Sequence, residues 1–315
     1  MHQRGSGAKQ RKTGQRLARD VVPRRYDVRL EVDPEAGDAY RGEVRIEVAL
    51  GAAQRRIELH AAELRIGRAR IRDAAGETSA RVELHPDRET VSLAPARPVG
   101  PGDATIELAF TGKLRTNLRG LYGARTAEHR YAFSQLEAAD ARRFLPCFDE
   151  PAMKARFRIA VTTRAAATVL SNAPIERTER HASGRKTVHF AETPPLSTYL
   201  VALAVGALES SVAARCGPTE IRVWHTPGKG KLTGVALEAA RECLARLERW
   251  FALPYPYAKL DLVAVPDFEA GAMENAGAIT YREVALLLDP KTAPAFSIAP
   301  ASKSGTATRS SLVYG

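Results

Sequence analysis

The chain has 315 residues, 44% of them hydrophobic, a formal net charge of +11 and only three cysteines. This length allows one or two domains with real cores, while no apolar run is long enough to cross a bilayer and no apolar stretch follows the basic start as a secretion signal would require. An odd number of widely spaced cysteines argues against a disulfide framework and favours a reducing, cytoplasmic location.

Most of the excess positive charge lies at the start of the chain. Residues 1–25 contain eight Lys and Arg residues against Asp20 alone, without hydrophobic periodicity. We therefore predict a disordered basic tail over residues 1–19. A basic arm can bind phosphate backbones, but this one has no interleaved aromatic residues for base stacking. A nucleic-acid adaptor stays open as an alternative interpretation of the whole chain, although we do not expect nucleic-acid binding.

From Pro23 the sequence takes on the period of a half-buried strand. Tyr26, Val28 and Leu30 alternate with charged residues, and residues 43–50 repeat the pattern. Gly, Pro and Asp residues separate the strand-like runs that follow. These runs are 57–59, 64–71, 82–84, 91–93, 105–110, 157–163, 187–190, 198–205 and 221–224. The pattern predicts a mainly β fold, an antiparallel sandwich or saddle, over residues 20–212.

The first helical periodicity comes at residues 237–251, where Leu237, Leu244 and Leu247 recur at helical spacing before Pro254. Strand patterns follow at 260–265 and 278–282. This change predicts a second, mixed α/β domain over residues 213–290. We also expect the apolar segments 260–265 and 285–288 to lack covering helices. Residues 291–315 turn polar and small without periodicity, which predicts an irregular, non-native tail.

Four stretches carry a family resemblance. In chain order they are 134–151 (SQLEAADARRFLPCFDEP), 193–202 (TPPLSTYLVA), 254–266 (PYPYAKLDLVAVP) and 266–275 (PDFEAGAMEN). Together they resemble the M1 family of zinc aminopeptidases, the aminopeptidase N-like enzymes, over roughly residues 20–290. The resemblance implies a β-rich N-terminal domain, then the start of a thermolysin-like α/β catalytic domain. It also implies an enzyme that removes N-terminal residues from peptides.

The resemblance further implies a substrate site. The backbone of Gly271 and Ala272 would hydrogen-bond a peptide, because glycine allows another chain to approach closely. Glu274 would bind the free α-ammonium group, with Glu137 as its partner and Gln135 nearby. Carboxylates fixed in a desolvated cleft suit an enzyme that must recognise a terminal cation. The predicted substrate-binding residues are Gln135, Glu137, Gly271, Ala272, Met273, Glu274 and Asn275.

The sequence lacks the pattern of a zinc site. Such a site needs two histidines one helical turn apart and a carboxylate ligand. The seven histidines are residues 2, 60, 85, 129, 181, 189 and 225, and no two are three or four apart. We predict that zinc belongs to the intact family enzyme and that this chain holds no metal and no catalytic residues.

The composition breaks abruptly near Ala299. We interpret the break as a frameshift or truncation that removed the catalytic helix, leaving an N-terminal fragment that is catalytically incomplete. The alternative is a pseudoenzyme, a non-catalytic module that binds peptides or partners. Under either interpretation we expect the chain to bind peptide N-termini and not to bind a membrane.

Three further sites have structural interpretations. Asp140, Arg142 and Arg143 are expected to form an ion-pair cluster. Cys147 lies in an apolar setting typical of an inert core thiol. His225 follows a strand pattern and is expected to be an edge histidine whose hydrogen bonds are satisfied.

Overall fold

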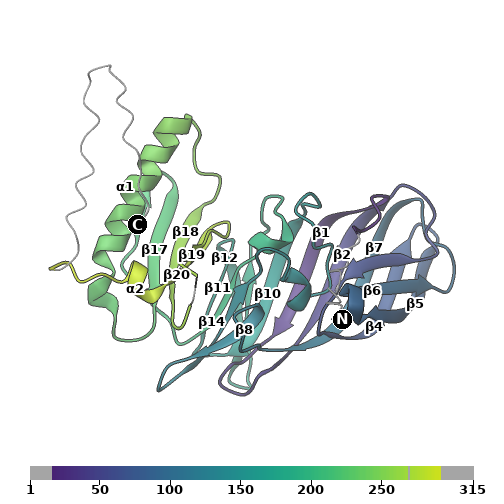
Figure 1. Cartoon of the computed structure of the whole chain (residues 1–315), viewed down its shortest axis with the longest axis horizontal. Helices are drawn as coiled ribbons and strands as arrows, with labels where there is room; N and C mark the ends of the chain where they lie inside the picture. The colour runs from purple at the N-terminus through teal and green to yellow at the C-terminus, as the bar shows by residue number, and fades with distance from the viewer. Residues whose placement is uncertain (1–15, 269, 292–315) are drawn as a thin grey trace, which may run out of the picture.

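The structure, a computed structural model, describes residues 16–268 and 270–291. It has a large lobe built almost wholly of strands and a small lobe in which a helix covers a sheet (Figure 1). The predicted tails, 1–19 and 291–315, fall almost entirely outside the described residues, as does the composition break near Ala299. Leu17 belongs to the predicted tail, yet it is buried in the core and its backbone N–H donates to Glu150 Oε1 at 2.6 Å. Leu17 therefore packs with the large lobe, although it lies within the predicted tail.

A ten-stranded sheet forms the outer layer of the large lobe. Its strand order is β12-β13-β10-β1-β2-β7-β4-β5-β6-β3, and neighbouring strands run antiparallel except β1 and β10, which are parallel. The strands are β1 (Val21–Glu31), β2 (Ala39–Leu50), β3 (Ile57–His60), β4 (Arg65–Asp73), β5 (Gly76–His85), β6 (Thr90–Pro95), β7 (Gly102–Lys113), β10 (Arg156–Arg164), β12 (Ile175–Arg180) and β13 (Arg185–Phe190).

A four-stranded antiparallel sheet, in the order β11-β14-β9-β8, forms the second layer. One hydrophobic core contains Val28 and Val161 from the larger sheet and Leu121 and Val205 from the smaller one, so the two layers form a sandwich. The strands are β8 (Gly120–Arg125), β9 (Arg130–Gln135), β11 (Thr168–Ser171) and β14 (Leu203–Gly206), and the short 3-10 turns of the chain are η1 (Pro86–Arg88), η2 (Ala141–Arg143), η3 (Thr198–Leu200) and η4 (Gly230–Leu232).

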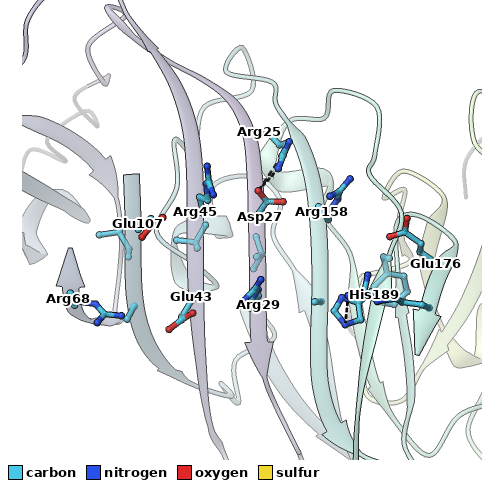
Figure 2. A pocket seen from close by; sticks show the side chains of 17 residues that line it. Arg25, Asp27, Arg29, Glu43, Arg45, Arg68, Glu107, Arg158, Glu176 and His189 are labelled. Carbon is cyan, nitrogen blue, oxygen red and sulfur yellow. Dashed lines mark hydrogen bonds and ion pairs between the residues drawn. The ribbon is translucent and has the colours of Figure 1, made fainter. Parts of the chain in front are cut away.

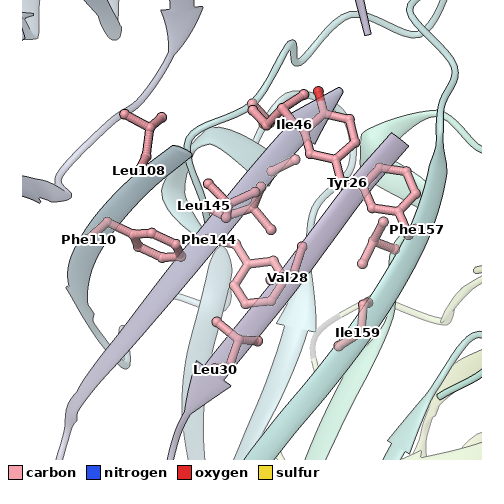
Figure 3. Close-up of a cluster of buried hydrophobic side chains, with 14 of the residues drawn as sticks. Tyr26, Val28, Leu30, Ile46, Leu108, Phe110, Phe144, Leu145, Phe157 and Ile159 are labelled. Atoms are coloured by element: carbon pink, nitrogen blue, oxygen red, sulfur yellow. The ribbon is translucent and has the colours of Figure 1, made fainter. Parts of the chain in front are cut away.

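The sandwich core follows from the period-two pattern of β1. Tyr26, Val28 and Leu30 all point inward and are almost fully buried (Figure 3). The Tyr26 ring stacks on that of Phe157 with 4.7 Å between centroids, and its hydroxyl accepts a hydrogen bond from the Phe148 N–H at 3.0 Å. Burying each such side chain contributes about 1.5–3 kcal/mol. Alternation of apolar and charged residues thus decides which face of β1 meets the second sheet.

The opposite face of the larger sheet carries charges of alternating sign (Figure 2). Arg158 on β10 faces Asp27 on β1, Asp27 faces Arg45 on β2, and Arg45 faces Glu107 on β7. Opposite charges across neighbouring strands stabilise a sheet, and like charges would destabilise it. The broad, charged hollow on this face, about 530 Å³ in volume, is therefore explained as the solvated side of the sheet.

The small lobe is a sheet covered on one side by α1 (Gly234–Phe251) (Figure 1). Its strand order is β15-β17-β18-β20-β19, with β16 also pairing β17, and β17, β18 and β20 run parallel. Leu244 of α1 packs with Ile221 and Leu262 of the sheet. The remaining elements are β15 (Glu209–Ser210), β16 (Ala214–Cys216), β17 (Thr219–His225), β18 (Lys259–Val265), β19 (Ala272–Met273), β20 (Ala278–Arg282) and α2 (Glu283–Leu286).

A second hydrophobic core joins the two lobes. It contains Tyr122 and Phe133 from the four-stranded sheet together with Val263, Val265 and Met273 from the small lobe. The four-stranded sheet is thus sandwiched between the ten-stranded sheet and the sheet of the small lobe. This arrangement brings the end of β9 and the strand β19 to the same junction.

The predicted fold class is confirmed, with corrections in detail. The segment predicted as one strand over 198–205 is the turn η3 followed by β14, and the apolar segment 285–288 overlaps α2. The expectation that strand 260–265 lacks cover is wrong, because its residues are buried between α1 and the large lobe. Exposed apolar side chains lie instead at the end of α1, where Trp250 is 84% exposed. The ranges 20–212 and 213–290 stay predictions.

Candidate functional site

The short strand β19 lies at the end of its sheet, and among the described strands it pairs only with β20. Ala272 lies opposite Tyr281, and the Arg282 N–H donates to the Gly271 carbonyl at 3.0 Å. Gly271 and Arg282 are therefore a hydrogen-bonded pair, and such pairs alternate along an antiparallel ladder. The N–H and C=O of Ala272 must then point away from β20, toward the open edge. An extended peptide could add to this edge as a further strand.

The side chains of the 271–275 segment point to different sides. Met273 is buried in the core that joins the lobes, whereas Glu274 is exposed. Asn275 is buried in a tight turn, where its N–H donates to the Met273 carbonyl at 3.0 Å and its own carbonyl accepts from the Ala278 N–H at 3.2 Å. Met273 and Asn275 thus hold the strand in place and present no side chain at the open edge, which leaves Glu274 and the backbone of Ala272 available.

Gln135 and Glu137 reach the junction from the large lobe. Gln135 ends β9, opposite Gly120, and its buried Oε1 has no hydrogen-bond partner among the described residues. Glu137 follows and is exposed, while Leu136 between them is buried in the sandwich core. A buried acceptor without a donor is costly, so Gln135 Oε1 is a site where a bound donor would be stabilised.

The carboxylates of Glu137 and Glu274 share an electrostatic property. Within the described part of the chain neither makes a hydrogen bond or an ion pair. Glu220, by contrast, is paired with Arg222 at 2.9 Å. The two carboxylates therefore keep their negative charge available to an external cation.

Tyr281 is a candidate that the sequence motifs did not single out. It lies directly opposite Ala272, so their side chains share a face of the sheet. Burial raises the pKa of Tyr281, and the charge of Glu274 raises it further. Tyr281 is thus a neutral hydroxyl close to Glu274. Pairing the predicted strand 278–282 with the 271–275 motif in this register would have identified it.

The cluster of Asp140, Arg142 and Arg143 has the structural role that was expected. Arg142 Nε donates to Asp149 Oδ2 at 3.0 Å, and Arg143 Nε donates to Asp140 Oδ1 at 2.8 Å. Arg143 also pairs with Glu89. These pairs fasten the segment that follows Glu137 to the sandwich.

The other two structural expectations have mixed outcomes. Cys147 is fully buried, and burial raises the pKa of its thiol, which confirms an inert core cysteine. The expectation for His225 is wrong on both counts. Its strand β17 lies inside the sheet between β15 and β18, and while Nδ1 bonds to the Thr226 carbonyl, the buried Nε2 lacks a partner among the described residues.

Metal ligands and membrane-spanning helices are two further features that bear on the kind of site. Among residues 16–268 and 270–291, no three His, Cys, Asp or Glu side chains come together as metal ligands would. Over the same residues, no helix is both long enough and apolar enough to cross a membrane. The arrangement that these residues do present is an open strand edge beside the carboxylate of Glu274.

Two family models and several known proteins match this sequence. The sequence model of the peptidase M1 N-terminal domain matches residues 22–200, and that of the peptidase family M1 domain matches residues 235–301. Aminopeptidase M1-B of Oryza sativa is 40% identical over 278 residues, which are 87% of this chain and 31% of that protein. The puromycin-sensitive aminopeptidase of Caenorhabditis elegans is 35% identical over 285 residues, or 88% of this chain and 30% of that protein.

A third relative matches over a shorter stretch. Probable aminopeptidase 1 of Saccharolobus solfataricus is 43% identical over 185 residues, which are 58% of this chain and 24% of that protein. The chain spans about a third of the length of the curated relatives with the longest matches. The first match covers the strands of the sandwich except β14, and the second covers the small lobe from α1 to β20 and α2. Strands β14, β15, β16 and β17 lie between the two matches.

Proposed function

Because the chain belongs to peptidase family M1, we propose that it forms the part of an aminopeptidase that binds the N-terminal end of a peptide substrate. The observation that carries the proposal is the open edge of β19, where the backbone of Ala272 faces outward beside the unpaired carboxylate of Glu274. The relatives named above are aminopeptidases, which supports the same activity for the whole enzyme to which this chain corresponds.

The proposed roles follow from the chemistry of each group. The substrate backbone pairs with the N–H and C=O of Ala272, and Gly271 leaves room for it because the space around its Cα is open. The α-ammonium of the substrate donates to Glu137 and Glu274, with Gln135 Oε1 as a further acceptor. Charged acceptors of this kind discriminate strongly against a peptide whose N-terminus is blocked, because they would be left unpaired.

We propose that zinc is a cofactor of the whole enzyme and is not held by this chain. The described residues do not provide a set of metal ligands, and no two histidines in the sequence are spaced one helical turn apart. We therefore assign no zinc chemistry to this chain and propose that it holds no catalytic zinc and hydrolyses no peptide. A cytoplasmic location is part of the same proposal, supported by the three free cysteines.

Binding of a C-terminally amidated tripeptide, leucyl-glycyl-glycine amide, tests the proposal. We expect the full chain to bind this peptide and to reject its N-acetylated form, as measured by calorimetric titration. Glu274→Gln should weaken binding about tenfold or more, because a hydrogen bond to a charged group contributes about 1.5–3 kcal/mol. Glu128→Gln is the matched control, since Glu128 is exposed in the loop between β8 and β9 and is not one of the proposed site residues, and it should leave the affinity unchanged.

Two results would contradict the proposal. Equal binding of the free and acetylated peptides would show that the α-ammonium is not recognised. Release of leucine by the pure chain, measured in the same samples together with its zinc content, would show that the chain is catalytically complete.

A further inference from the structure

A second cavity lies between the lobes, away from β19. This interlobe cleft, about 520 Å³ in volume, is lined by β11 and β13 of the large lobe and by β17 and β18 of the small lobe. Small-molecule sites in proteins have volumes of roughly 300–1,000 Å³ and often lie between domains. The cleft is therefore large enough for a ligand, and its lining decides which kind.

The small-lobe wall follows from strand alternation. Ile221 and Val223 of β17 pack toward α1, so Arg222 and Trp224 face the large lobe. The Trp224 Nε1–H donates to Asp261 Oδ1 at 2.8 Å, and Lys259 Nζ donates to the other carboxylate oxygen at 2.6 Å. The indole is thus held in place, and the charge of Asp261 is neutralised by Lys259. This wall offers an aromatic surface and no free negative charge from Asp261.

The large-lobe wall carries a cation without a counterion. Lys186, Val188 and Phe190 share one face of β13, and Lys186 makes no hydrogen bond or ion pair within the described residues. Its cross-strand neighbour on β12 is Arg180, a second cation. Like charges opposite each other destabilise a sheet. Burial lowers the pKa of Lys186, and the charge of Arg180 lowers it further, as expected for a cation that lacks an anion.

The carboxylates that line the cleft do not balance the charge of its cations. Glu220 is already engaged by Arg222 Nε at 2.9 Å and by Arg215 at 3.3 Å, and Asp261 is engaged by Lys259. With Lys186, Arg215, Arg222 and Lys259 against these two carboxylates, the lining has a net positive charge. Beside the cations lie the apolar side chains of Leu170, Val188 and Phe190.

We propose that the interlobe cleft binds a small carboxylate that bears an apolar group, with the carboxylate between Lys186 and Arg222 and the apolar group against Trp224 and Val188. The C-terminal end of a short apolar peptide and a medium-chain fatty acid share this chemistry. The proposal is independent of the aminopeptidase function, because its ligand needs no free amino group.

The test uses N-acetyl-leucyl-phenylalanine and the matched carboxamide, with the full chain. Trp250 is exposed on α1, so a Trp250→Phe background leaves Trp224 as the sole tryptophan and a reporter within the cleft. We expect a saturable fluorescence change with the acid and none with the amide. Lys186→Gln should weaken binding of the acid about tenfold, as for loss of one charged hydrogen bond. Lys113→Gln, an exposed lysine at the end of β7, should have no effect.

Octanoate in place of the acetylated dipeptide distinguishes the two sources of the carboxylate. Tighter binding of octanoate assigns the cleft to fatty acids, and tighter binding of the dipeptide assigns it to peptide ends. If Lys186→Gln fails to fold by circular dichroism, Arg222→Gln carries the same expectation. Equal binding of acid and amide, no saturable signal with any carboxylate at millimolar concentration, or wild-type affinity in the folded variants would overturn the proposal.

Discussion

His60 shows how one buried side chain can make stability depend on pH. It is 5% exposed, and its Nδ1 accepts a hydrogen bond from the Asp149 N–H at 3.2 Å. Burial, and after it the charge of Arg142, lower the pKa of His60 from the ordinary 6.5 to about 4. Protonation of Nδ1 would remove its lone pair and break the bond to Asp149. The hydrogen bond between the His60 side chain and the segment after Glu137 therefore exists only while the imidazole is neutral.

We predict that the free energy of unfolding falls as the pH drops from about 6.5 to 4. In this window the unfolded chain binds a proton at His60 and the folded chain does not, so stability present above pH 6.5 is lost progressively, by roughly 2–4 kcal/mol. Urea unfolding at a series of pH values measures the effect. His60→Gln keeps an acceptor for the Asp149 N–H and cannot titrate, so its stability should depend less on pH over this window. Parallel curves for the two proteins would refute the assignment.

At the level of elements, the turn between β19 and β20 depends on a glycine. Gly277 has φ +70°, and a Cβ there would lie 2.3 Å from the Asn172 carbonyl oxygen. The left-handed backbone of Gly277 and its close contact with Asn172, in the loop after β11, both exclude a side chain. This turn also fixes the register of β19, and with it the outward direction of the Ala272 backbone.

Gly277→Ala should therefore destabilise the protein, by at least about 1–2 kcal/mol from the left-handed backbone alone. The close contact with Asn172 adds to this loss. Gly271→Ala is the matched control in the same segment, since its Cβ would meet no atom within 4 Å, and we expect a change within about 0.5 kcal/mol. Thermal unfolding of the two variants measures the difference; similar melting temperatures would contradict the account of the turn.

The elements that sequence periodicity predicts are those with one face in a core and one in solvent. Strand β2 alternates throughout, β1 alternates from Tyr26 onward, and α1 has a helical stripe, so all three were predicted. Strand β9 was not, because Ala132 faces the sandwich core while Phe133 faces the core between the lobes, which leaves no polar alternation. Strand β12 was missed for the opposite reason, since all its residues are exposed.

The candidate site was predictable in part for a similar reason. Local motifs identified Glu137 and Glu274 as candidates. The burial of Met273, the proximity of Tyr281 to Glu274 and the unpartnered Gln135 Oε1 all depend on strand register or on packing between distant segments. Residue types at fixed spacing contain no record of such long-range pairing. The same limit applies to the interlobe cleft, whose two walls are far apart in the sequence.

At the scale of the whole molecule, the lobes share enough structure to unfold together. Besides the common hydrophobic core, Asn172 of the large lobe joins them through its side chain. Its Nδ2 donates to the Leu200 carbonyl and to the Ala276 carbonyl of the small lobe, both at 2.8 Å, and its Oδ1 accepts from the Ala202 N–H at 2.8 Å. Asn172 is 1% exposed, so no water can replace these bonds without rearrangement.

The two lobes can be monitored separately, because both tryptophans, Trp224 and Trp250, lie in the small lobe. Far-ultraviolet circular dichroism reports the secondary structure of both lobes, and most of the strands lie in the large lobe. We predict that urea unfolding followed by fluorescence and by circular dichroism gives coincident transitions in the wild type, the mark of one cooperative unit.

Asn172→Ala should separate the two transitions and lower the fluorescence midpoint more than the dichroism midpoint. The substitution leaves three backbone groups without their side-chain partner, each costing about 1–3 kcal/mol. One of these three bonds, to the Ala276 carbonyl, is the only hydrogen bond from the Asn172 side chain to the small lobe among the described residues. Asn117→Ala is the control, because Asn117 is exposed in the loop before β8 and should leave both curves unchanged. Separate transitions in the wild type would mean that the shared core does not couple the lobes, and the interlobe cleft would then open before the sandwich unfolds.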